Sequence, residues 1–175
     1  RVNQTVQFPC MIARMGPRVL SLLLLGTLAI PAAAQEGGTE LPSSGSALPK
    51  TPEGRSAVRS AKLRQFAHAW LGTPYLWGGT TKNGIDCSGY LREMFRTVYN
   101  IELPRTTKEQ IDMGIEVRLD PHNLGKGFEP GDLFFYVDSV GVPSHVVTYI
   151  GGGQFTHSLG GRGVLIEGMK ALWGR

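Results

Sequence analysis

The chain has 175 residues, with 18 Lys or Arg and 14 Asp or Glu, and a formal net charge of +4. This length allows one ordinary domain. The basic excess lies in residues 1–34, which carry three arginines and no acidic residue, so that 15 basic and 14 acidic side chains remain beyond them. A net charge near +1 gives no reason to expect nucleic acid as a partner.

Residues 1–34 have the pattern of a secretory signal peptide. Arg14 and Arg18 precede a twelve-residue apolar run at 19–30, and Ala32 and Ala34 follow at the small-residue positions of an A-x-A cleavage site. The run is shorter than the roughly 20 residues that span a bilayer. We therefore expect cleavage after Ala34. Met11 and Met15 are both candidate starts, so residues 1–10 or 1–14 could lie outside the native chain.

Cleavage would leave Cys87 as the single cysteine, because Cys10 departs with the signal segment. One cysteine in an exported protein indicates a free reactive thiol, an intermolecular bridge or an inert buried residue. No cysteine directly follows the apolar run for lipidation, so we expect no membrane anchor on the mature protein. We expect export, and periplasmic residence rather than full secretion, because the leader is short and nothing resembles a wall anchor.

Two amphipathic helices are predicted in the first half of the mature chain. Residues 35–55 are rich in Gly, Pro and Ser, which predicts a disordered leader before a domain at 56–175. From Ser56, apolar residues recur at helical spacing up to a stop at Gly72; these are Leu63, Phe66, Ala67, Trp70 and Leu71. A second helix is predicted from Cys87 to about Asn100, with Leu91, Phe95 and Val98 as its apolar stripe.

Strands dominate the second half. After a charged connection at 102–129, Pro130 and Gly131 indicate a turn before a strand, and residues 144–150 and 154–158 form two short strands around three glycines, as in a hairpin. Helices followed by antiparallel strands predict an α+β domain, with the helices packed on one face of the sheet.

Cys87 stands at the start of the second predicted helix, where unpaired backbone N–H groups and the helix dipole stabilise an anion. A thiolate is favoured there, and the thiolate is the nucleophilic form of cysteine. Asp86 is a good helix cap, and Gly89 permits close approach of another backbone or of a substrate. The alternative is a small buried side chain at a helix end.

Two histidines in the predicted hairpin favour the catalytic interpretation. A nucleophilic cysteine needs a base, and the base needs a group that orients it. Side chains alternate along strands, so His145 and His157 share a face only if paired residue numbers have an even sum. A turn centred on Gly151 would pair them directly, one centred on Gly152 would leave them diagonal, and an odd sum would separate them.

The combined segments resemble the NlpC/p60 family of bacterial cell-wall cysteine endopeptidases. The matching blocks, in order, are GTPYLWGGTTKNGIDCSGYLREMF, ELPRTTKEQ, PGDLFFY, SHVVTYIGGGQFTHS and GVLIEGM. The resemblance implies a compact papain-like fold and hydrolysis of an amide bond in peptidoglycan stem peptides. That bond is either γ-D-glutamyl-diaminopimelate or the D-alanyl-diaminopimelate cross-bridge. No metal or cofactor is implied, and any recruiting protein is unknown.

The same resemblance assigns roles to single residues. It makes Cys87 the nucleophile, His145 the base and His157 the residue that orients His145. Tyr75 would help to hold the oxyanion together with backbone N–H groups, one of them from Cys87. Asp86 and Ser88, the two neighbours of the nucleophile, would line the substrate site, where the acid could meet an amino group.

Three other readings stay open. The chain could be an inactive module that only binds peptidoglycan, or an amidase or acyltransferase on a related fold. The third is a zinc site built from Cys87, His145 and His157 with water as the fourth ligand. The sequence offers no H-E-x-x-H motif and no closely spaced ligand pair for it.

Overall fold

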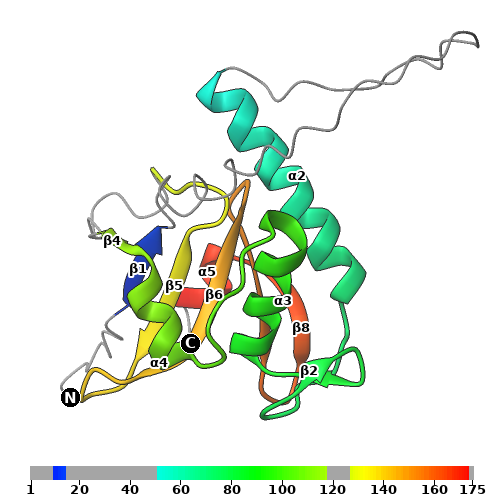
Figure 1. The fold of residues 1–175 in the computed structure, drawn as a ribbon, viewed down its shortest axis with the longest axis vertical. Helices are drawn as coiled ribbons and strands as arrows, with labels where there is room; N and C mark the ends of the chain where they lie inside the picture. Colours follow the sequence, from blue (N-terminus) through cyan, green and yellow to red (C-terminus); the bar gives the residue numbers. More distant parts are fainter. Residues whose placement is uncertain (1–9, 15–50, 118–126, 174–175) are drawn as a thin grey trace, which may run out of the picture.

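A computed structural model describes residues 10–14, 51–117 and 127–173 of the chain. These residues form an α+β fold around an antiparallel sheet of six strands in the order β4-β1-β5-β6-β7-β8, as the sequence predicted for the fold class (Figure 1). The elements are β1 (Cys10–Arg14), α2 (Pro52–Trp70), β2 (Thr80–Thr81), β3 (Gly84–Ile85), α3 (Cys87–Tyr99), α4 (Thr107–Gln110), the 3-10 helix η1 (Ile111–Met113), β4 (Ile115–Val117), β5 (Leu133–Val137), β6 (Pro143–Gly151), β7 (Gln154–Leu159), β8 (Gly163–Gly168) and α5 (Met169–Trp173).

Helix α2 begins earlier than the sequence analysis predicted. The Thr51 hydroxyl accepts a hydrogen bond from the N–H of Gly54 at 3.1 Å, and Pro52 occupies the first turn. Both are strong start signals, because the cap satisfies an unpaired N–H and proline has none to satisfy. Residues 52–55 therefore belong to the helix, and the prediction of a disordered leader is wrong for them. Residues 35–50 lie outside the described part of the chain. Leu71, placed in the buried stripe by its spacing, is 46% exposed.

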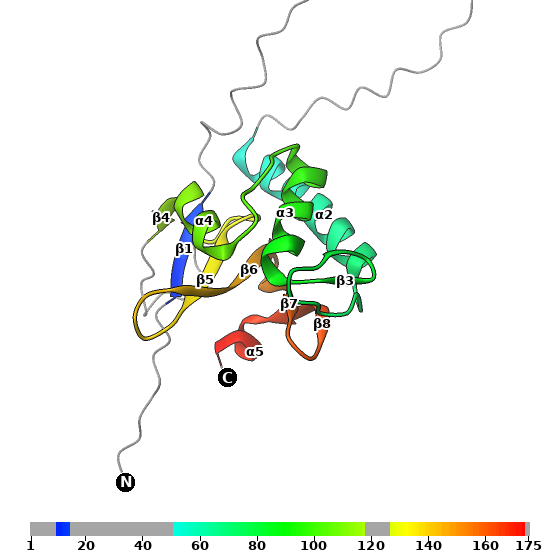
Figure 2. The same ribbon diagram turned by 60° about the horizontal axis from the view of Figure 1, so that its bottom comes forward.

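Helix α3 has the predicted bounds, and it packs beside α2 on the sheet (Figure 2). The rings of Phe66 and Trp70 from α2 contact Tyr90 of α3, and all three are buried. A fully buried side chain of this size contributes roughly 1.5–3 kcal/mol. Asn100 ends the helix in the left-handed conformation, with φ of 56°. This packing fixes the first turn of α3, and hence Cys87, against the sheet.

The β6–β7 hairpin has the register centred on Gly152. Thr148 lies opposite Thr156 and Tyr149 opposite Phe155, so the paired numbers have an even sum. The turn between the strands consists of three successive glycines with φ of 89°, 62° and 72°, values that other residues adopt only at a cost. His145 and His157 consequently point to the same side of the sheet on a diagonal, one of the two arrangements predicted.

The charged connection at 102–129 contains three elements that the sequence analysis did not predict. Thr106 and Glu109 form a reciprocal capping box that starts the single turn α4, and η1 and β4 follow directly. These elements are too short for hydrophobic periodicity to reveal them. Residues 118–126 lie outside the described part of the chain.

Strand β1 lies between β4 and β5, although its residues belong to the predicted signal peptide. Ala13 is buried in the core, and the Arg14 guanidinium donates to both carboxylate oxygens of Asp132 at 2.8 Å. The Asp132 side chain is only 1% exposed. Cleavage after Ala34 would remove this strand and its arginine from the sheet.

In the described residues, no helix has the length and apolarity needed to cross a membrane.

Candidate active site

Cys87 is the first residue of α3, and its sulfur faces strand β6. The Asp86 side chain caps the helix by accepting from the N–H of Gly89 at 2.7 Å. Backbone N–H groups of Val146, Ser88 and Cys87 lie close enough to the sulfur to lower the pKa of the thiol. Because Val146 follows His145 directly, the thiol lies beside the strand position that carries the predicted base. The side chain is 7% exposed.

The protonation state of this thiol differs from the sequence-based expectation. Burial raises the pKa of Cys87, and the Asp86 carboxylate raises it further. The N–H groups of Val146, Ser88 and Cys87 itself lower the pKa but do not outweigh burial. The helix start does stabilise an anion, as predicted, yet desolvation penalises the charged form more. The resting residue is therefore a thiol, and its activation requires a base.

The two histidines predicted to act together are hydrogen-bonded. Nε2 of His145 lies 2.7 Å from Nδ1 of His157. His157 is 2% exposed, whereas His145 lies at the start of β6 and is only partly buried. The arrangement leaves the other nitrogen of His145, Nδ1, outside this pair. A base oriented by a second polar group is what thiol activation requires.

A third residue, Glu167, is hydrogen-bonded to this pair, and it was not singled out from the sequence. Oε1 of Glu167 on β8 lies 2.7 Å from Nε2 of His157, and Oε2 accepts from Arg162 at 3.3 Å. Glu167 pairs with Phe155 across the β7–β8 ladder, which places it on the same face as His157. An acidic residue in an otherwise apolar strand was the signal available for finding it.

Tyr75 lies close to the nucleophile. It pairs with Ile85 in an isolated bridge and is partly buried. Burial raises the pKa of its hydroxyl, and the Asp86 carboxylate and the Cys87 thiolate, once that forms, raise it further. The hydroxyl therefore stays protonated and can donate a hydrogen bond near the sulfur. The role of Tyr75 as an oxyanion donor stays a prediction.

Asp86 and Ser88 are engaged by the protein itself, contrary to the expectation that the acid could meet an amino group. Arg105 donates to both oxygens of Asp86 at 3.0 and 2.7 Å and to the Ser88 hydroxyl at 2.9 Å. The carboxylate also accepts from the N–H of Gly78 at 2.8 Å and from that of Gly89. With both oxygens occupied and 7% exposure, Asp86 holds the helix start in place and is not free for substrate.

No group of three His, Cys, Asp or Glu side chains that could hold a metal is found in residues 10–14, 51–117 and 127–173. Both ring nitrogens of His157 already have hydrogen-bonding partners, His145 and Glu167. His157 would have to break one of these bonds to act as a zinc ligand. The arrangement suits acid–base chemistry better than metal coordination.

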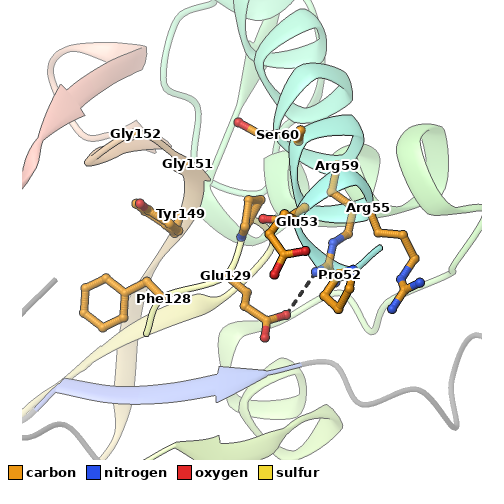
Figure 3. A pocket seen from close by; sticks show the side chains of 13 residues that line it. Pro52, Glu53, Arg55, Arg59, Ser60, Phe128, Glu129, Tyr149, Gly151 and Gly152 are labelled. Atoms are coloured by element: carbon orange, nitrogen blue, oxygen red, sulfur yellow. Dashed lines mark hydrogen bonds and ion pairs between the residues drawn. The ribbon is translucent and has the colours of Figure 1, made fainter. Parts of the chain in front are cut away.

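A hollow of about 730 Å³ lies elsewhere, between α2 and the β6–β7 turn (Figure 3). Phe128 and Tyr149 face it from one side, and the ion pair between Arg59 and Glu129 crosses it at 3.0 Å. None of the residues predicted for catalysis lines this hollow. It is therefore separate from the thiol and the histidine pair.

Comparisons with known proteins agree with the resemblance noted in the sequence. The chain is 35% identical to the probable endopeptidase NlpC homolog of Haemophilus influenzae over 127 residues, covering 72% of this chain and 64% of the relative. It is 43% identical to the murein DD-endopeptidase MepS/murein LD-carboxypeptidase of Escherichia coli K12 over 114 residues, covering 65% of this chain and 56% of the relative. The chain thus spans less than two thirds of the length of either relative.

Solved structures show the same fold. The NlpC/p60 domain of the peptidoglycan hydrolase SagA aligns with a TM-score of 0.54 and 29% identity, over 65% of this chain and 92% of that domain. The peptidoglycan hydrolase RipB of Mycobacterium tuberculosis aligns with a TM-score of 0.52 and 28% identity, over 69% of this chain and 63% of the RipB chain. The sequence profile of the NlpC/P60 family matches residues 72–174, more than half of the chain. The chain therefore belongs to the NlpC/P60 family.

Proposed function

We propose that this protein is a cysteine peptidase that hydrolyses an amide bond in peptidoglycan stem peptides. The observation that carries the proposal is the 2.7 Å hydrogen bond between His145 and His157 beside the Val146 N–H that faces the Cys87 sulfur. Names of relatives support the substrate class, since they include a murein DD-endopeptidase and peptidoglycan hydrolases. The bond we expect is γ-D-glutamyl-diaminopimelate or the D-alanyl-diaminopimelate cross-bridge.

The proposed chemistry is acyl transfer through a thioester. His145 takes the thiol proton, and the Cys87 sulfur attacks the amide carbonyl carbon. The oxyanion that forms is held by the Tyr75 hydroxyl and by backbone N–H groups at the start of α3. His145 returns its proton to the leaving amine, and a water molecule deprotonated by His145 then hydrolyses the thioester. Every proton is moved by a residue of this chain.

The raised pKa of Cys87 supports this order of steps. A thiol that burial keeps protonated is shielded from random alkylation and oxidation, and it becomes a nucleophile only when His145 removes its proton. The partly buried position of His145 at the start of β6 suits a group that must reach both the thiol and an incoming peptide. His157, more deeply buried, suits an orienting role.

The test is digestion of defined muropeptides followed by mass assignment of the fragments. We expect cleavage by the unmodified protein and none above background by Cys87→Ala. Cys10→Ser is the matched control, because it removes the other thiol of the chain and should leave cleavage unchanged. Equal product from Cys87→Ala would leave the chain as a peptidoglycan-binding module. Hydrolysis of an amide bond outside the stem peptide, or an acyl-transfer product, in place of cleavage within the stem peptide would assign it to the amidase or acyltransferase alternative.

We also propose that the protein is exported and acts in the periplasm. The signal-peptide pattern of residues 1–34 and the cell-wall substrate class support this location. The place of β1 inside the sheet is the observation that weighs against removal of the whole segment before folding. The intact mass of the protein recovered from the periplasm decides between a chain cut after Ala34 and one that keeps β1.

A further inference from the structure

We propose that Glu167 is a positioning residue that fixes the tautomers of both histidines and thereby makes Nδ1 of His145 the proton acceptor. This rests on the proposed function of Cys87 and His145. The three side chains form one line of hydrogen bonds, with 2.7 Å between His145 and His157 and 2.7 Å between His157 and Glu167.

The tautomer of each histidine is set by its hydrogen-bonding partner on the side of Glu167. An ionised carboxylate can only accept hydrogen bonds, so Nε2 of His157 must carry the proton that is donated to Glu167. A neutral imidazole has one donor and one acceptor nitrogen, so Nδ1 of His157 is then an acceptor. Nε2 of His145 must therefore donate to it, which makes Nδ1 the acceptor nitrogen of His145. That nitrogen is the one able to take the thiol proton.

The surroundings of Glu167 make it suited to this role. Its side chain is 6% exposed and that of His157 is 1% exposed, so water does not compete for the bond between them. Arg162, at the β7–β8 turn, places a guanidinium 3.3 Å from the second carboxylate oxygen, which favours a fixed position for the carboxylate. Arg162 itself is 58% exposed and contributes less, because solvent screens it.

Glu167 also acts after the proton has moved. When His145 becomes imidazolium, its Nε2–H still donates to His157, and the line of hydrogen bonds links the new positive charge to the Glu167 carboxylate. No second proton needs to move, because each bond keeps its donor and its acceptor. A buried carboxylate at the end of such a line stabilises the charged base.

The direct test reads the tautomers by long-range ¹H–¹⁵N correlation spectra of the full chain with ¹⁵N-labelled histidine. The chain carries Cys87→Ala so that no reaction occurs, and substitutions of single histidines assign the four ring systems. We expect His145 and His157 both to carry their proton on Nε2. A proton on Nδ1 of His157 would overturn the proposal. This measurement needs no variant of Glu167, so it can be made even if such a variant fails to fold.

The kinetic test uses Glu167→Met, which keeps the side-chain length and removes the acceptor. We expect kcat to fall about 10²-fold, at the low end of what a positioned general base supplies, with KM unchanged and with mixed tautomers in the spectra. The control is Glu93→Gln, which removes an acidic group paired with Arg96 on the outer side of α3 and should change neither quantity. Unchanged kcat and unchanged tautomers in a folded Glu167→Met would overturn the proposal.

The two proposals can fail separately. Wild-type protein that cleaves muropeptides but has the reversed tautomers retains the proposed function and loses the role of Glu167. Protein with the expected tautomers that cleaves no muropeptide retains the role of Glu167 as the group that orients the histidines and loses the peptidase function.

Discussion

The Asp86 carboxylate caps the helix that begins with Cys87, and the same carboxylate binds the Arg105 guanidinium through both oxygens at 2.7 and 3.0 Å. One side chain therefore joins the start of α3 to the segment that leads into α4. Burial alone would raise the pKa of Asp86, but the hydrogen bonds from Arg105, Gly89 and Gly78 outweigh it, so the pKa is lowered.

The first prediction concerns the pH dependence of this ion pair. Asp86→Asn keeps a capping side chain and removes the charge, so we expect a loss of roughly 1–3 kcal/mol at pH 7. Because the folded pKa lies below the unfolded value of about 3.9, the stabilisation is full above the unfolded pKa and is lost as the pH falls through the folded pKa. Urea unfolding of both proteins should show the difference shrinking towards pH 3 or below. An equal difference at every pH would contradict it.

A second prediction follows from the buried thiol. Because burial raises the pKa of Cys87, the folded protein holds less thiolate at pH 8 than the unfolded chain does. Iodoacetamide should therefore modify Cys87 more slowly in the folded protein than in urea, with a rate that climbs at higher pH. Peptide mapping by mass spectrometry measures this at Cys87 separately from Cys10. A fast rate in the folded protein that stays flat from pH 6 upward would indicate a preformed thiolate.

Tyr75→Phe tests the proposed oxyanion donor. The substitution removes one hydroxyl beside Cys87 and keeps the ring, so the fold should be unaffected. We expect a loss of about 10²- to 10³-fold in kcat, the usual effect of losing one such donor. Muropeptide cleavage rates and a thermal unfolding curve together check the prediction. A lower unfolding temperature with unchanged turnover would assign Tyr75 a structural role.

Strand β1 leads to a fourth prediction. Without Arg14 the buried Asp132 carboxylate loses its ion pair and the hydrogen bond to Oδ1, and leaving a buried acceptor unsatisfied costs about 1–3 kcal/mol. We expect residues 35–175 alone, and the full chain with Arg14→Ala, to unfold at lower urea concentrations than the full chain. Arg18→Ala, outside the strand, is the control. Equal midpoints for all four proteins would mean that β1 adds nothing to the stability of the sheet.

The fifth prediction separates thiol from metal chemistry. Cleavage should survive a strong chelator, because both ring nitrogens of His157 are used within the hydrogen-bonded line. Prolonged treatment with iodoacetamide should abolish cleavage. The muropeptide assay after each treatment measures both effects. Loss of activity on chelation, with recovery on adding zinc, would revive the zinc alternative.

The sequence alone determined the elements whose signals are local. The apolar stripe of α3 indicates the helix, which ends at the left-handed Asn100. Three consecutive glycines mark the turn of the hairpin. Cys87 and both histidines could therefore be placed on a helix and on strands from the sequence. Side-chain alternation limited the histidine geometry to a direct or a diagonal pair for an even register and to opposite faces for an odd one. The fold decided the register. These inferences succeed because helix and strand periods are properties of the chain itself.

Only the tertiary structure decided the contacts between distant segments. Arg105 reaches Asp86 across 19 positions, and Arg14 reaches Asp132 across 118. Such partners are chosen by packing, for which a single sequence contains no local signal. The same holds for the charge on Cys87. Its place at a helix start predicted a favoured thiolate, but burial, which depends on every element packed around the sulfur, raised its pKa instead.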